Sequence, residues 1–549
     1  MNQINWQAVT PQFDQFESSF ANLHSIELTH YFELQERALA TFRHFTLLSG
    51  MARFLVINCC DNPIYRGLVE EGLNSIDPEL VVLKTETLSP SHLFDCYKLN
   101  ANGDVEIITG LFSKARGGIG IVTVSANLLL ANPGSWPAIK AAVLGESLPI
   151  SPLKPEWQSS HLEPTCYDIK LVITGDRGQL ADLEYLDPDL FSPMTLFTEL
   201  EEDFHLGEEN LDAYVGYIKW ICDRYHLPSF DKDALHRLLI AGVRETEDQH
   251  YLPLSPIWLH QWLSLAAIES QGYQINGEHM DAAIEEKYFR ESYLPQRAID
   301  DILDGQVIIE TTGEQIGQIN GLTVIDVAGH PVSYGEPARI SCVIHFGDGD
   351  ISDVERKAEL GGNLHAKGMM IMQAFVSSAL QLDAPLPYSA SIVFEQSYSE
   401  VDGDSASLAE LCCLVSALSE YPINQQIAVT GAVDQFGRVQ AVGGLNEKIE
   451  GFYQVCKHQG FTGEQGVILP ETNLKHLALH KEVVESIKLG EFHIWAVSDV
   501  EDVIPIIMNK PFCGEDEDSV LNKIAERIDN FAKHDHPQGF VQWIKNWFV

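Results

Sequence analysis

The sequence lacks long apolar runs, and none reaches the ~18–20 residues that a membrane-spanning helix requires. Its opening residues, MNQINWQAVTPQFDQF, also lack the basic-then-apolar layout of a secretory signal peptide. These two absences argue against an integral membrane protein and against export. We therefore expect a soluble protein of the cytoplasm with no membrane partner.

Regular cysteine spacings and basic residues are also scarce. The ten cysteines include the adjacent pairs Cys59/Cys60 and Cys412/Cys413, and no CxxC motif indicates a zinc site or a disulfide framework. Only 35 Lys and Arg stand against 79 Asp and Glu, which gives a net charge of −44. Because this charge repels phosphate backbones, it argues against nucleic acid as the main partner. We expect buried thiols and no metal.

The chain is too long for one hydrophobic core, since domains usually hold roughly 100–200 residues and this sequence has 549. It is 45% hydrophobic without a low-complexity tract, which is typical of a folded globular protein. In residues 1–50, apolar residues recur at three- and four-residue steps. This spacing predicts an N-terminal helical segment that covers or joins other units.

Residues 51–185 have the pattern of a three-layer α/β module. Buried-strand runs alternate with helical or irregular stretches: RFLVINC (53–59), ELVVLKT (79–85), GIGIVTVSA (118–126) and YDIKLVITGD (167–176). The layout is typical of nucleotide binding, but its chemistry is missing. The first strand leads into CCDNPIYRGLVEEGL (59–73), without the GK[ST] of a phosphate loop, and the strand that should end in adjacent acids reads IVTVSAN (121–127). We therefore expect no nucleotide cofactor.

Three further units follow. Residues 186–290 show helical periodicity and predict a helical lid. Over residues 291–510, β-branched runs with Gly and Pro punctuation are joined by helical stretches, which predicts a second α/β domain. Residues 511–549 are interpreted as an acidic linker, a helix and an aromatic tail, with His534 and His536 as solvated turn residues rather than metal ligands.

A loop in the second α/β domain, EVDGDSAS (400–407), separates a strand from a helical pattern. The apolar face of that helix predicts a start at or just after DSAS: Leu408, Leu411, Cys412, Val415 and Leu418. One interpretation is a cap, because Ser407 and Glu410 match a capping box worth roughly 1 kcal/mol. The other is a nucleophile, because a serine at a helix N-terminus lies beside N–H groups that can stabilise an oxyanion. The two roles are compatible.

A nucleophilic serine needs a base, and Lys448 is the candidate in QQIAVTGAVDQFGRVQAVGGLNEKIEGFYQVCKHQG (425–460). This segment is interpreted as a strand ending at Thr430, a turn, a second strand and a Gly443–Gly444 hinge into a helix. Lys448 borders the apolar stripe of that helix, and we expect it to be half buried. Desolvation would lower its pKa and let the neutral amine accept a proton. The alternative, an ammonium group that reaches water, stays open on spacing alone.

Several segments together resemble the proteolytic domain of Lon family serine proteases: FEQSYSEVDGDSAS (394–407), AVTGAVDQFGRVQAVGGLNEKIEG (428–451), GVILPETN (466–473), GQINGLTV (317–324) and LHAKG (364–368). The resemblance covers roughly residues 300–505. The serine loop is most similar to the branch of the family that reads EGDSAS. The preceding region resembles the AAA+ module of that branch with degenerate nucleotide motifs.

The resemblance implies a Ser-Lys dyad in which Ser405 is the nucleophile and Lys448 is the general base. Thr430 matches the threonine that holds the family's lysine by a hydrogen bond, and Asp402 matches an acidic position that can contact the dyad. His365 in LHAKG is given no catalytic role. The resemblance also implies an α/β peptidase fold and a homo-oligomer, a hexameric ring that encloses the sites.

The favoured hypothesis is a serine endopeptidase of protein quality control that hydrolyses unfolded or damaged polypeptides without ATP hydrolysis. Two alternatives stay open: an ATP-dependent Lon protease with a cryptic nucleotide site, and a non-proteolytic chaperone-like ring. The presence of both Ser405 and Lys448 argues against the non-proteolytic chaperone-like ring. A further possibility is that Asp402 holds Ser405 in an idle position.

Overall fold

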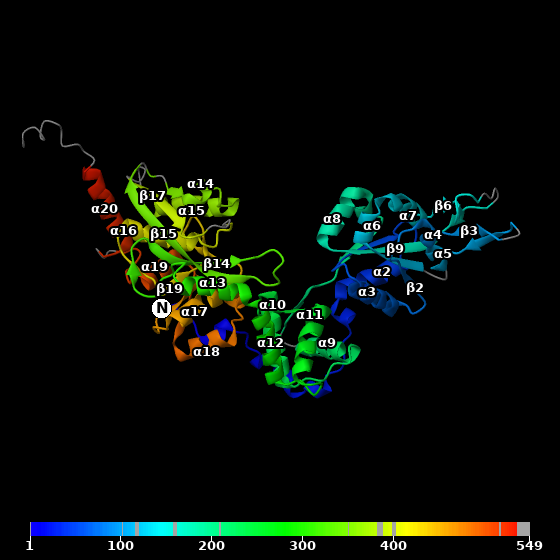
Figure 1. Cartoon of the computed structure of the whole chain (residues 1–549), viewed down its shortest axis with the longest axis horizontal. Coiled ribbons are helices and arrows are strands. Elements are labelled where there is room, and N and C mark those ends of the chain that lie inside the picture. Colours follow the sequence, from blue (N-terminus) through cyan, green and yellow to red (C-terminus); the bar gives the residue numbers. More distant parts are fainter. Residues whose placement is uncertain are drawn as a thin grey trace, which may run out of the picture.

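Three bodies follow one another in the chain, and Figure 1 shows them along the long axis of the molecule. We call them the N-terminal α/β module, the helical subdomain and the C-terminal α/β domain. The structure, a computed structural model, describes these residues: 2–100, 103–115, 120–157, 162–207, 210–347, 349, 351–380, 388–397, 402–514 and 518–534. The predicted aromatic tail falls in 535–549, outside the described residues.

The N-terminal α/β module contains a five-stranded parallel sheet in the order β10-β1-β9-β5-β2. Its strands are β1 (Phe54–Asn58), β2 (Val81–Lys84), β5 (Gly120–Ser125), β9 (Ile169–Gly175) and β10 (Thr195–Glu199). Every residue of β1, β5 and β9 is buried, because helices cover both faces of the sheet. Its last strand, β10, follows residue 185, where the sequence placed the end of the module.

Helices pack on the two faces of this sheet in separate cores. On one face α3 (Pro63–Ile76) packs against apolar residues of β1. The other face is covered by α6 (Ala126–Ala131), α7 (Trp136–Val143) and α8 (Arg177–Leu186). The carboxyl ends of the parallel strands therefore meet at one edge, beside the start of α3.

The helical subdomain consists of α9 (Leu211–Arg224), α10 (Lys232–Thr246), α11 (Pro256–Glu269) and α12 (Gly277–Glu291). Side chains cap three of these helices at their N-termini, since Asp231, Ser255 and Asn276 each accept a backbone N–H of the first turn. The four helices share one core with α3. No helix within the described ranges is long and apolar enough to cross a membrane.

The C-terminal α/β domain contains a seven-stranded sheet in the order β16-β17-β15-β14-β19-β22-β23. Its strands are β14 (Gln318–Ile325), β15 (Tyr334–Phe346), β16 (Ile351–Asp353), β17 (Tyr388–Phe394), β19 (Ile427–Val429), β22 (Gln465–Pro470) and β23 (Phe492–Val497). Strands β14, β19, β22 and β23 run parallel, so their carboxyl ends share one edge. That edge is the expected position of a site in an α/β sheet.

Two sets of helices cover this second sheet. One face carries α15 (Asn363–Ala379), α16 (Ser407–Ser419), α19 (Val500–Met508) and α20 (Val520–His534). The other face carries α17 (Leu445–Gln459) and α18 (Lys481–Leu489), while α13 (Tyr293–Leu303) packs on α17. All thirteen residues of α16 are buried, which makes it the central helix of the domain.

The N-terminal segment, residues 2–47, touches all three bodies, and we call it the strap. The backbone of residues 2–4 pairs antiparallel with that of residues 494–496 in β23, through two hydrogen bonds of 3.0 and 2.9 Å. Val9 is buried in the core of the C-terminal domain. From Phe13 onward the strap packs on the helical subdomain and the N-terminal module, and it ends in α2 (Glu36–Leu47).

Candidate active site

Ser405 lies in a loop that is bonded to the carboxyl end of β19. Its carbonyl oxygen accepts hydrogen bonds from Gly431 N–H (2.9 Å) and from Thr430 Oγ1 (3.4 Å). Thr430 is fully buried, whereas Ser405 is half-buried. Thr430 therefore orients the serine loop directly, and it makes no hydrogen bond to Lys448 in the described part of the chain.

The capping-box prediction for Ser407 is wrong. The N-cap of α16 is Ala406, which offers no side-chain acceptor. Ser407 Oγ instead accepts a hydrogen bond from Val433 N–H at 3.1 Å, across the hairpin that follows β19. Ser407 therefore fixes the helix start to the strand end. Glu410, its expected partner, is buried elsewhere.

Asp402 lies at the outer side of the serine loop and is exposed. Its Oδ1 accepts hydrogen bonds from the N–H groups of Leu364 (3.1 Å) and Gly403 (3.1 Å). The first of these groups belongs to the first turn of α15, whose N-cap is a glycine without a capping side chain. Asp402 therefore links the serine loop to α15, and within the described residues it makes no hydrogen bond to Ser405.

Lys448 lies in the first turn of α17 and is only 3% exposed, which is deeper than the half-burial expected from its place beside the apolar stripe. Burial lowers its pKa to about 8, although Glu447 and Asp404 act in the opposite direction. Gly444 positions this turn. It has a left-handed φ of +63°, and a Cβ there would lie 2.5 Å from the side chain of Val324.

Ser405 directly precedes Ala406, the N-cap of α16, and Lys448 lies in α17, and these two helices cover opposite faces of the sheet. Asp404, next to Ser405, is close enough to Lys448 to act on its pKa. Among the described residues, no hydrogen bond joins Ser405 Oγ to Lys448 Nζ. A buried lysine whose pKa is lowered to about 8 can accept the proton of a hydroxyl that comes within hydrogen-bond distance.

A buried cluster behind the serine loop was missed from the sequence. His365 in α15 is 2% exposed, with Nε2 3.2 Å from Asp353 Oδ2 and Nδ1 3.7 Å from Glu410 Oε1. Burial raises the pKa of Glu410 to about 7. The three residues lie far apart in sequence, and only the position of Glu410 inside an apolar helix could have signalled the cluster. Neither this cluster nor any other group of His, Cys, Asp and Glu in the described ranges could hold a metal ion.

In the N-terminal α/β module, the connection after the first strand is too short for a phosphate loop. β1 ends at Asn58 and α3 begins at Pro63, which leaves four residues between them. Asn62 Oδ1 already accepts the N–H groups of Ile64 (3.0 Å) and Tyr65 (3.1 Å). The N-terminal donors that could bind a phosphate are therefore partly used.

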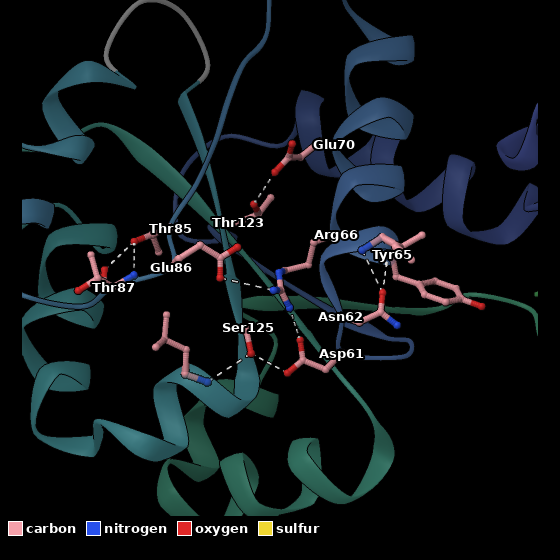
Figure 2. Close-up of polar contacts among 12 residues, drawn as sticks. Asp61, Asn62, Tyr65, Arg66, Glu70, Thr85, Glu86, Thr87, Thr123 and Ser125 are labelled. Atoms are coloured by element: carbon pink, nitrogen blue, oxygen red, sulfur yellow. Dashed lines mark hydrogen bonds and ion pairs between the residues drawn. The ribbon is translucent and has the colours of Figure 1, made fainter. Parts of the chain in front are cut away.

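An internal ion pair fills the carboxyl edge of the same sheet, as Figure 2 shows. Arg66 Nη1 lies 2.7 Å from Asp61 Oδ1, and Ser125 Oγ donates to Asp61 Oδ2 at 2.6 Å. The side chains of Arg66 and Asp61 are 8% and 4% exposed. A buried carboxylate thus occupies the place where a nucleotide phosphate would need positive charge.

Comparison with known proteins relates two separate parts of the chain to Lon proteases. Residues 394–510 match the family described as Lon protease (S16) C-terminal proteolytic domain, and residues 99–198 match the LonB-like AAA domain. The chain is 43% identical over 487 residues to a Lon protease homolog of Escherichia coli (strain K12), an alignment that covers 85% of this chain and 80% of the relative.

Two further relatives extend this similarity. A Lon protease homolog of Haemophilus influenzae is 38% identical over 456 residues, which are 80% of this chain and 74% of the relative. An archaeal Lon protease of Thermoplasma volcanium is 24% identical over 430 residues, which are 74% of this chain and 61% of the relative. The similarity thus extends across both α/β bodies.

Proposed function

Because this chain belongs to the Lon protease family, we propose that it is a serine endopeptidase that hydrolyses unfolded or damaged polypeptides through a dyad of Ser405 and Lys448. The observation that carries the proposal is the burial of Lys448 at the sheet edge that also carries the serine loop. Burial supplies a neutral amine near physiological pH, which an exposed lysine does not.

The proposed reaction begins when neutral Lys448 takes the proton of Ser405 Oγ, which attacks the peptide carbonyl carbon. Within the described part of the chain, the N–H groups of Ser405 and Ala406 make no hydrogen bond, and they are the proposed donors to the oxyanion. Lys448 then protonates the leaving amine as the C–N bond breaks. Water, deprotonated by the same lysine, hydrolyses the acyl-enzyme and regenerates Ser405.

We further propose that the resting dyad is unassembled. Ser405 and Lys448 are not hydrogen-bonded to each other, and Asp402 and Thr430 tether the serine loop through other groups. Binding of an extended peptide would draw Ser405 Oγ toward Lys448, since catalytic hydrogen bonds often form only in the substrate complex.

We propose that proteolysis proceeds without ATP hydrolysis. The short connection after β1 and the buried Asp61–Arg66 pair support this, because the Arg66 charge at this edge is already neutralised by Asp61 and is not offered to a triphosphate. The proposed working form is a hexameric ring in the cytoplasm. All ten cysteines are free and seven of them are buried, which fits a reducing compartment.

Degradation of unfolded casein tests the dyad. We expect the wild-type protein to degrade casein and the variants Ser405→Ala and Lys448→Ala to lose at least about a thousandfold in rate, as removal of a nucleophile or its base does. Lys457→Ala is the matched control, because Lys457 lies on the same helix and pairs with Glu482 at the surface. Equal degradation by all variants would refute the dyad, and binding of casein without cleavage would favour the chaperone-like alternative.

The same assay with ATP and magnesium tests the role of the module. We expect equal rates with and without nucleotide, and no binding of ATP at micromolar concentrations by calorimetry. A severalfold stimulation would instead support a cryptic nucleotide site.

A further inference from the structure

One arginine of the helical subdomain contacts α17, the helix that carries Lys448. Arg244 in α10 makes a two-pronged contact with Glu450 of α17, with Nη1 2.5 Å from Oε1 and Nη2 2.8 Å from Oε2. Its Nη2 also lies 3.5 Å from Glu447 Oε1, and Nη1 donates to Ala478 O at 3.4 Å. Such fork-to-fork pairing fixes orientation as well as distance.

The carboxylates bound by Arg244 lie on both sides of the proposed base in the sequence. Glu447 directly precedes Lys448, and Glu450 follows it two residues later. The side chains of Glu447 and Glu450 are 19% and 12% exposed. Glu447 Oε2 is buried without a hydrogen-bond partner among the described residues, so Arg244 is the main source of compensation for that carboxylate.

Close backbone packing leaves α17 little room to shift. A Cβ at Gly335 in β15 would lie 2.0 Å from the carbonyl oxygen of Glu447, so strand and helix are in direct backbone contact. Glu450 also accepts the N–H of His480 at 2.8 Å. Helix α17 is therefore held between Arg244 and the backbone of β15.

We propose that Arg244 is a positioning residue for the proteolytic reaction: it seats α17 and offsets the two carboxylates beside Lys448, and so connects the helical subdomain to the general base. This inference rests on the proposed function of Lys448. It also gives the helical subdomain a means of acting on the peptidase without nucleotide, since any rotation of α10 would change the Arg244 contacts.

The electrostatic directions agree with this role. Burial raises the pKa of Glu450, but Arg244 and His480 together outweigh that effect and the net pKa is lowered. Burial also raises the pKa of Glu447, which Arg244 partly offsets. An ionised Glu447 stabilises the ammonium form of Lys448. Without Arg244, the charge of an ionised Glu447 would act on Lys448 without this compensation and would reduce the fraction of neutral base.

Other charged and titratable groups around α17 remain in place when Arg244 is removed, although burial raises the pKa of Tyr288 among them and Arg244 partly offsets that rise. They come from the end of α10, from α12, α13 and β15, from the serine loop and from the turn before α18: Glu247, Tyr288, Asp301, Glu336, Asp404 and His480. The Arg244 side chain is 33% exposed in a cleft of ≈ 1590 Å³ between the helical subdomain and the C-terminal α/β domain, so solvent screens part of its charge. The expected effect is therefore moderate.

The test is the pH profile of kcat/KM for an unstructured fluorogenic peptide, measured on the full-length protein. We expect Arg244→Ala to move the acid limb about half a unit to one unit upward, a roughly three- to tenfold loss at pH 7 with an unchanged high-pH plateau. Glu447→Gln should move the limb downward, and the double variant should lie near the wild type. Arg244→Lys keeps the charge but loses the two-pronged contact with Glu450, so it should recover only part of the rate that Arg244→Ala loses at pH 7.

Arg237→Ala is the matched control, because Arg237 lies two turns earlier on α10 and pairs with Asp281 inside the helical subdomain. Its profile should superimpose on that of the wild type. A loss in Arg244→Ala that is equal at every pH, or that Glu447→Gln does not reverse, would overturn the inference alone. Peptide hydrolysis by the wild type that persists in Ser405→Ala would overturn the proposed function itself, and the inference with it.

Discussion

Lys448 gives the sharpest prediction, because its burial can be converted into a pH dependence. Burial lowers the pKa of Lys448 from 10.5 to about 8. At pH 7.5 this leaves roughly a quarter of the molecules with a neutral amine, against about 0.1% for a lysine with an ordinary pKa. If Lys448 is the base, the neutral form is thus on the order of two hundred times more abundant than it would be for an exposed lysine.

The predicted kcat/KM for a short peptide rises tenfold per pH unit below about pH 7 and levels off above about pH 8.5. Measurement between pH 6 and 10 in buffers of constant ionic strength tests this, with Lys457→Ala as a control that keeps the same limb. The chemical step is isolated by using the rate of acylation of Ser405 by an activated ester. A limb centred near pH 10, or a flat profile in both assays, would refute the argument that a buried Lys448 is the base.

Three further predictions follow from buried groups. Lys448→Met should abolish activity yet raise the melting temperature at pH 7. The pKa of Lys448 is lower in the folded than in the unfolded state, so its ammonium form destabilises the fold by up to about 3 kcal/mol below pH 8. The stability gained by the methionine variant should therefore fade as the pH rises from about 8 to 10.5. Arg66→Met should destabilise the N-terminal α/β module by about 3–5 kcal/mol by stranding Asp61, and adding Asp61→Asn should restore much of it, as followed by urea unfolding. Gly444→Ala should lower both the melting temperature and kcat/KM, since its φ costs about 1–2 kcal/mol and Val324 blocks the new methyl group; a variant as active and stable as the wild type would contradict this.

The fold class and the family could be predicted from the sequence, and both are confirmed. The α/β assignment depended on local patterns, such as the apolar run of residues 54–57 in β1 and the helical stripe that follows Ser407. The family assignment depended on several short segments in a fixed order. Local signals of this kind survive without any knowledge of tertiary contacts.

Contacts between distant residues could not be predicted. The capping box failed because Ser407 Oγ is bound by Val433, 26 residues away, and because Glu410 faces His365 in another helix. Arg244 and Glu450 are 206 residues apart, and no spacing rule relates them. The roles of Ser405, Lys448, Thr430 and Asp402 stay predictions, and the variants above test those of Ser405 and Lys448.

The strap described above sets an order of events during synthesis. Gln3 and its partner His493 are separated by 490 residues, so at roughly 5–20 residues per second the ribosome needs about half a minute or more to make the second after the first. Before His493 is synthesised, residues 2–9 have no β23 edge to bind. The later part of the strap can already fold with the helical subdomain during that time. Closure of this edge is therefore a late event of high contact order, and it would couple completion of the peptidase sheet to prior assembly of the rest of the chain.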